Sequence, residues 1–412
     1  MGNLFKIAIR NLFRYKRRTM LTASLITVGV VFVLAFIAVS GTFKNMMISQ
    51  ITDSMIGHLQ VHRKGYVASI ETLPINLNLK GAAIAKLETI LAEQPEIEAW
   101  SPRIKFGGMF SNFTETSSIR ITAIDPEKEF KTVPLLPLRV TDGSKELKRG
   151  EILIPELLAR GMKMKPGDIA VIVATNADGS VNGKQFTVAG IMESATGPGG
   201  RDGYIHMEDA REILRMDGQQ VSEFVIRLKD FGKLAAFSTK LEGRLAKELN
   251  QQGKPIFELH TWEKLSPFFN IARMIDLMTF FIKIMLIAIV LVSIMNVMIM
   301  AVYERIREIG TIAAIGTQPG KILNMFVIEG FCMGVMGALI GNIVGIGLIF
   351  VLNLLELTYD FGREKGIILQ GSISPADILV ISATVIVVSV IASLQPAFKA
   401  SRMEPIKALR HV

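Results

Sequence analysis

The sequence of 412 residues contains a single cysteine, Cys332. One cysteine cannot form an intramolecular disulfide, so any part of the chain outside the cytoplasm must be held together by its apolar core. Charged residues are also few, at 20% of the chain, whereas hydrophobic residues make up 50%. This composition fits a large soluble protein as well as a membrane protein. The distribution of charges along the chain distinguishes between these two classes.

Enzyme motifs are missing from the sequence as well. The nearest match to a phosphate-binding loop, Gly179–Gln185, is one residue short between its glycines and has no Ser or Thr after the lysine. We interpret this segment as a turn, and Gly197–Gly200 as a mobile loop rather than a phosphate cradle. There is no Gly-x-Ser-x-Gly nucleophile motif and no pair of aspartates in the apolar runs. The sequence thus predicts no catalytic residues and no ATPase motif.

A metal site is not expected either. His58 and His62 have the spacing of two zinc ligands on a helix, but Leu59 stands where the metalloprotease pattern requires Glu. The alternation of Leu59 and Val61 favours a strand, on which the two imidazoles would stand about 13 Å apart. We therefore predict no metal and no bound cofactor in this chain.

Four long runs without any charge are present. Each has 20 to 26 residues, enough to cross a bilayer core of about 30 Å as a helix. Buried helices of a soluble domain would need a polar stripe to face water, which these runs lack. The runs are Thr19–Phe43, Ile284–Tyr303, Gly330–Leu355 and Ile378–Phe398.

Lys and Arg gather beside these runs and predict the orientation of the chain. Residues 1–19 carry six of them and no acid, and the segments 303–321 and 395–412 are also basic. By the positive-inside rule all three segments are cytoplasmic, which requires an even number of crossings. The net charge of +9 is then explained by topology and by contact with anionic membrane lipid, without nucleic acid as a partner.

We therefore expect four transmembrane α-helices and a large extracytoplasmic α+β domain with a mostly β insertion. The transmembrane helices are predicted at 19–43, 274–303, 322–355 and 375–396. The remaining expected parts are an amphipathic cytoplasmic N-terminal helix at 1–18, a periplasmic domain at 44–273, a cytoplasmic segment at 304–321, a short periplasmic loop at 356–374 and a cytoplasmic tail at 397–412.

Periodicity suggests an internal order for the periplasmic domain. Its α/β base is predicted at 44–106 and 221–273, and the β-rich insertion at 107–220, where short β-like runs alternate with turn signals. Two patterns predict strands, and two predict helices because apolar residues recur three and four apart. The strands are expected over Leu73, Ile75, Leu77 and Leu79 and over Phe224, Ile226 and Leu228; the helices over Ile84, Leu87, Ile90 and Leu91 and over Leu234, Phe237, Leu241, Leu245 and Leu249.

Two features of the third run point to helix packing and to a buried charge. Its glycines are spaced to share one face of a helix, which predicts a close contact with another helix. They are Gly330, Gly334, Gly337, Gly341 and Gly345. Glu329, next to this stripe, is an ionisable residue within the span, and its depth predicts a salt bridge to Arg305 or Arg307 with either a structural or a mechanistic role.

The segment after the second run is just long enough for a short surface helix and a turn. Its Gly310 and Gly316 can adopt positive φ and so end or redirect a helix. The stretches Glu304–Gly316 and Gln395–Arg410, with Ala8–Leu12 at the start, resemble permeases of the ABC transporter superfamily that includes MacB, FtsX, LolC and LolE. The resemblance extends over essentially the whole chain. Within it, Gly57–His62 and Gly65–Tyr66 look most like the lipoprotein-releasing LolC/LolE branch, whereas Glu304–Gly310 looks closer to the general MacB-like pattern.

This resemblance implies a bacterial inner-membrane permease that works as a dimer, with a second copy or a paralogue. It implies a separate cytoplasmic ABC ATPase subunit that binds ATP and Mg, since this chain has no room for one before residue 19. The coupling residues would be Glu304, Arg305, Arg307, Glu308, Gly310 and Gly316. The motion of the periplasmic domain would extract or export a lipoprotein, a lipid or another amphiphile. The alternatives are force transmission to a periplasmic cell-wall hydrolase, or MacB-like efflux of a drug or peptide; a membrane sensor without an ATPase would not need Glu304–Gly316.

Overall fold

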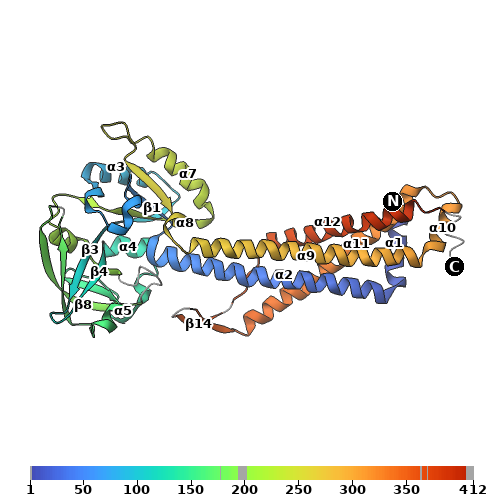
Figure 1. The fold of residues 1–412 in the computed structure, drawn as a ribbon, viewed down its shortest axis with the longest axis horizontal. Helices are drawn as coiled ribbons and strands as arrows, with labels where there is room; N and C mark the ends of the chain where they lie inside the picture. The colour runs from blue at the N-terminus through green and yellow to red at the C-terminus, as the bar shows by residue number, and fades with distance from the viewer. Residues whose placement is uncertain (1, 177, 194–201, 362–363, 369, 405–412) are drawn as a thin grey trace. The chain divides into compact units, whose positions relative to one another are not determined.

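The chain divides into two compact units, which are described separately (Figure 1). The helical unit comprises Met1–Asn45 and Ala272–Val412, and the globular unit comprises Met46–Ile271. The computed structural model describes residues 2–176, 178–193, 202–361, 364–368 and 370–404. The Gly197–Gly200 loop and the final part of the C-terminal motif, 405–410, lie outside the described residues.

Within the described residues, four helices are long and apolar enough to cross a membrane: α2 (Lys16–Ile51), α9 (Phe269–Glu304), α11 (Pro319–Leu354) and α12 (Pro375–Ser401). A helix of 36 residues, such as α9, is about 54 Å long and exceeds the bilayer core. These helices confirm the four spans and, together with the globular unit, the fold class expected from the sequence. The helical unit also contains α1 (Gly2–Arg14), α10 (Ile306–Ala314) and the short hairpin of β13 (Thr358–Phe361) and β14 (Glu364–Ile368).

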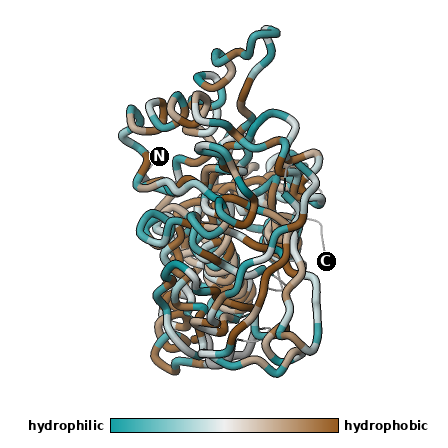
Figure 2. Tube along the Cα trace, turned by 90° about the vertical axis from the view of Figure 1, so that its left-hand side faces the viewer, coloured by the Kyte–Doolittle hydropathy of each residue, from teal (hydrophilic) through white to brown (hydrophobic). Residues whose placement is uncertain are grey.

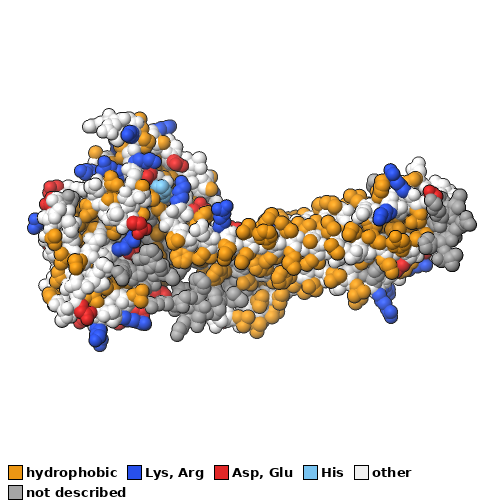
Figure 3. All heavy atoms as spheres, viewed as in Figure 1, with side chains coloured by type: hydrophobic (Ala, Val, Ile, Leu, Met, Phe, Trp, Pro, Cys, Tyr) orange, Lys and Arg blue, Asp and Glu red, His pale blue; other side chains and the backbone are white. Residues whose placement is uncertain are grey.

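The surface of the helical unit is apolar along the length of its helices. Figure 3 shows a nearly continuous cover of hydrophobic side chains there, with basic and acidic groups gathered toward one end. A second set of apolar side chains is buried between the helices, among them Ile26, Val290, Ile294, Phe326 and Val385. Helices that are apolar on all sides in this way fit a lipid environment.

The globular unit is built on one large mixed sheet. Its first part has the order β12-β1-β11-β3 and is antiparallel throughout. These strands are β1 (Leu59–Arg63), β3 (Ile97–Ser111), β11 (Glu223–Leu228) and β12 (Phe257–Thr261). Helices α3 (Gly81–Ala92) and α7 (Leu234–Leu245) belong to the same part, and each buries the face expected from its 3.6-residue period.

The second part of the sheet closes on itself. The strand β3 continues past β11 and pairs with both β4 and β7, so that the pairings form a ring, β3-β4-β9-β6-β8-β7 and back to β3. In Figure 2 the tube through the strands has long hydrophobic stretches, and the turns are hydrophilic. The additional elements are β4 (Thr116–Ile124), β5 (Val140–Gly143), β6 (Glu151–Pro155), β7 (Ile169–Thr175), β8 (Val181–Met192), β9 (Asp202–His206), α4 (Pro126–Thr132), α5 (Glu156–Gly161) and α6 (Met207–Ile213).

Two local predictions were wrong. The residues 73–79 do not form a strand: Ile75–Leu77 is a 3₁₀ turn, and only Leu79–Lys80 is extended and paired. Pro74 has no N–H to donate to a sheet, and the asparagines beside the apolar residues favour turns. Leu249 lies beyond α7, because Asn250 Oδ1 accepts hydrogen bonds from the backbone N–H groups of Gln252 and Lys254 and so holds a turn there.

A charged cluster lies in the interior of the globular unit. Arg103 of β3 is 1% exposed and donates to Glu129 of α4 from Nε at 2.9 Å and to Glu223 of β11 from Nη1 at 3.2 Å. Lys105 and His62 also contact the Glu223 carboxylate, at 2.9 and 3.4 Å. Burial raises the pKa of Glu223, but Lys105, the His62 hydrogen bond and Arg103 together hold it well below its usual range. The Glu223 carboxylate thus joins β1, β3 and β11, and Arg103 links this group to α4 through a second carboxylate, that of Glu129.

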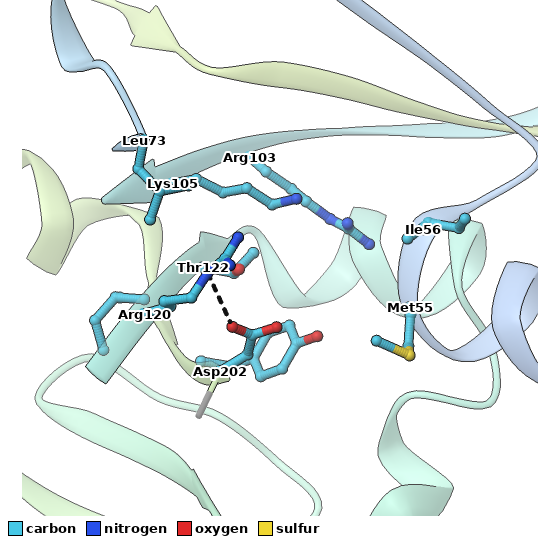
Figure 4. A pocket seen from close by; sticks show the side chains of 10 residues that line it. Met55, Ile56, Leu73, Arg103, Lys105, Arg120, Thr122 and Asp202 are labelled. Atoms are coloured by element: carbon cyan, nitrogen blue, oxygen red, sulfur yellow. Dashed lines mark ion pairs between the residues drawn. The ribbon is translucent and has the colours of Figure 1, made fainter. Parts of the chain in front are cut away.

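Arg103 and Lys105 also line a small cavity of about 50 Å³ (Figure 4). On its other side, Arg120 of β4 and Asp202 of β9 form an ion pair at 3.4 Å. Each basic side chain of this cavity is therefore paired with a carboxylate of the same unit. We interpret the cavity as part of the interior charge network and not as a ligand site.

Replacing Glu223 with Gln should destabilise the globular unit by about 3–5 kcal/mol, because Arg103 would stay buried with one carboxylate fewer. The unfolding of this unit can be followed in the full chain, since its two tryptophans, Trp100 and Trp262, both lie there. Glu71→Gln is the control, because that side chain is 83% exposed. Equal midpoints of thermal unfolding for the two variants would contradict the prediction.

The same variants should differ in their response to acid. The pKa of Glu223 is lower in the folded than in the unfolded state, so its contribution is complete above the ordinary glutamate pKa of about 4.3 and is lost as the pH falls below it. The wild type should therefore lose stability below about pH 4 more steeply than Glu223→Gln does.

Candidate coupling site

The corner between α9 and α10 is formed by Arg305. Its backbone has φ −113° and ψ 18°, which is outside the helical range, so that α9 ends at Glu304 and α10 begins in a new direction at Ile306. At the other end of α10, Gly316 has φ +96°. The N–H of Gly316 bonds to the carbonyl of Ala313 and that of Thr317 to the carbonyl of Ile312, which is a Schellman motif. The segment is therefore a short helix with a defined start and stop, followed by Pro319 at the first turn of α11.

One side of α10 is buried and the other is exposed. Ile306, Ile309 and Gly310 are buried in the helical unit. The side chains of Glu304, Arg307 and Glu308 are exposed. Two apolar residues near the end of the segment are exposed as well, Ile312 at 39% and Ile315 at 81%. The outer side of α10 thus combines charges of both signs with apolar area, a combination typical of a protein-binding surface.

Arg305 and Glu329 form a buried ion pair. Nη1 of Arg305 donates to Oε2 of Glu329 at 3.3 Å, and the two side chains are 2% and 0% exposed. The guanidinium also lies over the ring of Tyr15, 4.7 Å from its centroid, a cation–π contact. Since Tyr15 lies between α1 and α2, this one arginine links the start of α10 to α11 and to the α1–α2 corner. Of the two arginines that the sequence left open as partners of Glu329, the structure pairs it with Arg305.

A second, exposed link joins α1 to α10. Nη1 of Arg14 lies 3.4 Å from Oε1 of Glu308, and both side chains are more than half exposed. Exposed pairs of this kind contribute at most about 1 kcal/mol and are easily broken. The contact of the buried Arg305 with Tyr15 therefore holds α10 against the α1–α2 corner, whereas the exposed Arg14–Glu308 pair can break and re-form.

The glycine stripe of α11 contacts two different helices. A Cβ added to Gly330 or Gly334 would lie 2.5 Å from atoms of Ser393 or Ser389, both on α12. Farther along the same helix the partner changes to α2. A Cβ on Gly337, Gly341 or Gly345 would lie 2.5, 2.7 or 2.8 Å from Ile26, Val30 or Leu34 respectively. We call this set of contacts the glycine seam.

Some of these partners carry a signal that sequence reasoning missed. Ser389 and Ser393 are four residues apart, a small-xxx-small pattern like that of the glycines. Each hydroxyl donates to a carbonyl of its own helix, so the serines leave no unsatisfied donor in the apolar interior. No comparable pattern points to Tyr15, whose role depends on where α1 meets α10.

Comparison with known protein families agrees with this architecture. The model of the MacB-like periplasmic core domain matches residues 19–244, more than half of the chain. The model of the FtsX-like permease C-terminal region matches residues 280–405, which include α10 and the five glycines of α11. The chain belongs to the MacB/LolC family of ABC transporter permeases. It is an inner-membrane protein, and the globular unit is its large periplasmic domain.

Individual relatives cover most of the permease. It is 23% identical to the lipoprotein-releasing system transmembrane protein LolC of Neisseria meningitidis, over 95% of this chain and 94% of the relative. To LolC of Xylella fastidiosa it is 26% identical, over 70% of this chain and 72% of the relative. It is 25% identical to the macrolide export ATP-binding/permease protein MacB 2 of Aeromonas hydrophila, over 98% of this chain and 60% of the relative.

Replacing Gly337 with Leu should separate α11 from α2, because a side chain would collide with Ile26. Overpacking of this kind lowers the free energy of unfolding by about 1–3 kcal/mol. Gly347→Leu is a matched control in the same helix, since a Cβ there meets no atom within 4 Å. The thermal midpoint of the detergent-solubilised permease should fall for the first variant only. If both variants unfold like the wild type, the seam does not hold the helices together.

Proposed function

We propose that the permease is driven by a separate cytoplasmic ABC ATPase subunit, which binds ATP and Mg and pushes on α10. The observation that carries this proposal is α10 itself, a short capped helix with a buried side and a mixed charged and apolar outer side. A loop that served only to connect two spans would not need a Schellman motif, or an arginine buried at its start.

The contacts of α10 suggest how its displacement would be transmitted to the other helices. The first step is the pair between Arg305 and Glu329, which ties the start of α10 to α11. The next step is the glycine seam, where the glycines of α11 lie directly against side chains of α12 and α2. Since α2 is one uninterrupted helix from Lys16 to Ile51, its displacement would act on the periplasmic domain into which it continues.

The end of α2 is suited to transmit force within the periplasmic domain. It continues as a π-helical turn at Thr52–Ile56, in which Asp53 accepts hydrogen bonds from Ser49 and from Arg227 of β11. The carbonyl of Asp53 also accepts from the N–H of Leu135 at 2.8 Å. The helix end is thus bound to two separate segments of the domain, and we propose that it moves them together.

We propose that the substrate is a lipoprotein, a lipid or another amphiphile taken from the outer leaflet of the inner membrane. The support is the match to LolC over nearly the whole length of both chains, a relative whose name states lipoprotein release. The match to a macrolide exporter over 98% of this chain supports drug or peptide efflux as the second candidate. A partner permease, identical or paralogous, would complete the assembly.

Reversing Glu304 and Glu308 to Lys should abolish transport, although it strengthens the positive-inside signal and so favours correct insertion. Gln318→Lys is the control, because it adds a positive charge just beyond α10. Proteoliposomes that contain the permease and its ATPase provide the measurement, as ATP-dependent release of a triacylated lipoprotein to the aqueous phase. If the double variant inserts, binds its ATPase and still releases lipoprotein at the wild-type rate, α10 is not the coupling element.

The same proteoliposomes test the substrate. Release of lipoprotein without uptake of a macrolide supports the first candidate, and the reverse result supports the second. ATP hydrolysis that drives neither, together with activation of a co-purified cell-wall hydrolase, would indicate force transmission instead.

A further inference from the structure

The helix α1 presents a stripe of basic residues. Lys6, Arg10 and Arg14 follow one another at intervals of four and therefore lie on one face, and Lys16 and Arg17 continue the positive charge into the start of α2. No acidic residue precedes Asp53 in the sequence. In Figure 1, α1 runs across the direction of α2 at the same end of the helical unit as α10.

Most of these basic side chains have no acidic partner in the part of the chain that the structure describes. Among the residues that the structure describes, no carboxylate lies within ion-pair distance of Lys6, Arg10, Lys16 or Arg17. Of these five side chains, Arg14 has an acidic partner among the described residues, the exposed Glu308 on α10. Five cations on one short segment repel one another, so a bound anion would lower the free energy of this arrangement.

Apolar residues beside the basic stripe indicate the kind of anion. Ala8 and Leu12 are buried against the helical unit, but Phe5, Ile7 and Phe13 are 44%, 45% and 64% exposed. A soluble acidic protein would neutralise the charges and leave these side chains in water. The cytoplasmic leaflet of a membrane supplies both parts, anionic headgroups for the cations and acyl chains for the aromatic and aliphatic side chains.

We propose that α1 binds anionic phospholipid headgroups, and that this binding adjusts the coupling helix α10. The two helices meet at Arg14 and Tyr15, the first in a weak exposed ion pair with Glu308 and the second under the buried guanidinium of Arg305. A lipid phosphate competes with Glu308 for Arg14, while the Tyr15 contact keeps α1 in place. Anionic lipid thereby releases the outer side of α10 for its cytoplasmic partner. This inference rests on the proposed coupling role of α10.

Binding is tested with the full chain and its ATPase subunit in nanodiscs of phosphatidylcholine mixed with phosphatidylglycerol. We expect the wild type to retain phosphatidylglycerol in preference to phosphatidylcholine, measured by native mass spectrometry. The variant Lys6→Gln/Arg10→Gln should lose that preference, because its affinity for phosphatidylglycerol should fall roughly fivefold for each removed charge. The control Lys321→Gln/Lys399→Gln removes as many exposed charges from other cytoplasmic positions and should keep it. Equal lipid preference in the two variants would overturn the proposal.

Adjustment of α10 is tested by ATPase activity in nanodiscs with and without phosphatidylglycerol. Phosphatidylglycerol should change the ATPase rate of the wild type severalfold and should leave the rate of Lys6→Gln/Arg10→Gln unchanged. Glu308→Gln should retain the lipid preference but lose the response, because Arg14 no longer exchanges between two anions. If α10 is not the coupling element, lipid preference persists while no variant changes the activity, which separates the failure of the proposed function from that of the lipid site.

An acidic surface of the ATPase subunit is the competing occupant of α1. In that case Lys6→Gln/Arg10→Gln weakens assembly with the ATPase equally in both lipid mixtures. This result would overturn the lipid proposal.

Discussion

Helices in hydrocarbon gain nothing by hiding apolar side chains from lipid, because the lipid is as apolar as they are. The helical unit therefore depends on close approach of its backbones, and in this permease the glycine seam provides it. A single added Cβ at any of the five glycines would lie 2.5 to 2.8 Å from an atom of another helix. The position of Glu329 depends on the same approach, since it directly precedes Gly330 at one end of the seam. Without the seam, the carboxylate would not reach Arg305 in an interior that excludes water.

Both units contain a buried arginine that is paired with glutamate and that joins separate elements of the fold. Arg305 joins α10 to α11 in the helical unit, and Arg103 joins α4 and β11 to β3 in the globular unit. Such pairs add little net stability, since removing two ions from water costs about as much as their attraction returns. Breaking one of them is costly, however, because the remaining charge stays buried. Their effect is to raise the free energy of alternative arrangements of the same segments, in which a charge would be buried without its partner. In the helical unit, turning α10 relative to α11 would break the pair between Arg305 and Glu329.

Much of this architecture could be predicted from the sequence, and the exceptions have physical reasons. Runs without charge identified the four membrane helices, and glycine spacing identified the contact face of α11. Spacing alone could not show that this face changes partner between Gly334 and Gly337, because the crossing of three helices is a tertiary property. It also left open whether Arg305 or Arg307 reaches Glu329. The choice depends on the backbone of Arg305, which leaves the helical range and points the side chain inward.

In the periplasmic domain too, local elements could be predicted from the sequence but their tertiary pairing could not. Periodicity predicted α3 and α7 with their buried faces, because a local pattern determines each helix. The ring of strands that includes β3 and β7 could not be foreseen, since it depends on pairings between distant segments. The alternation of apolar residues at 73–79 does not produce a strand, because Pro74 cannot donate to a sheet and Asn76 and Asn78 favour turns.

The change of partner within the glycine seam restricts how the length of α11 can vary in evolution. One residue inserted between Gly334 and Gly337 would rotate the rest of the helix by about 100°. The first two glycines would still meet α12, but the last three would turn away from α2 and present larger side chains to it. Insertion of a whole helical turn would restore the angle only approximately and would shift Ile26, Val30 and Leu34 out of register with their glycines. Relatives that keep this seam are therefore expected to conserve the spacing of the five glycines more strictly than the identity of the residues between them.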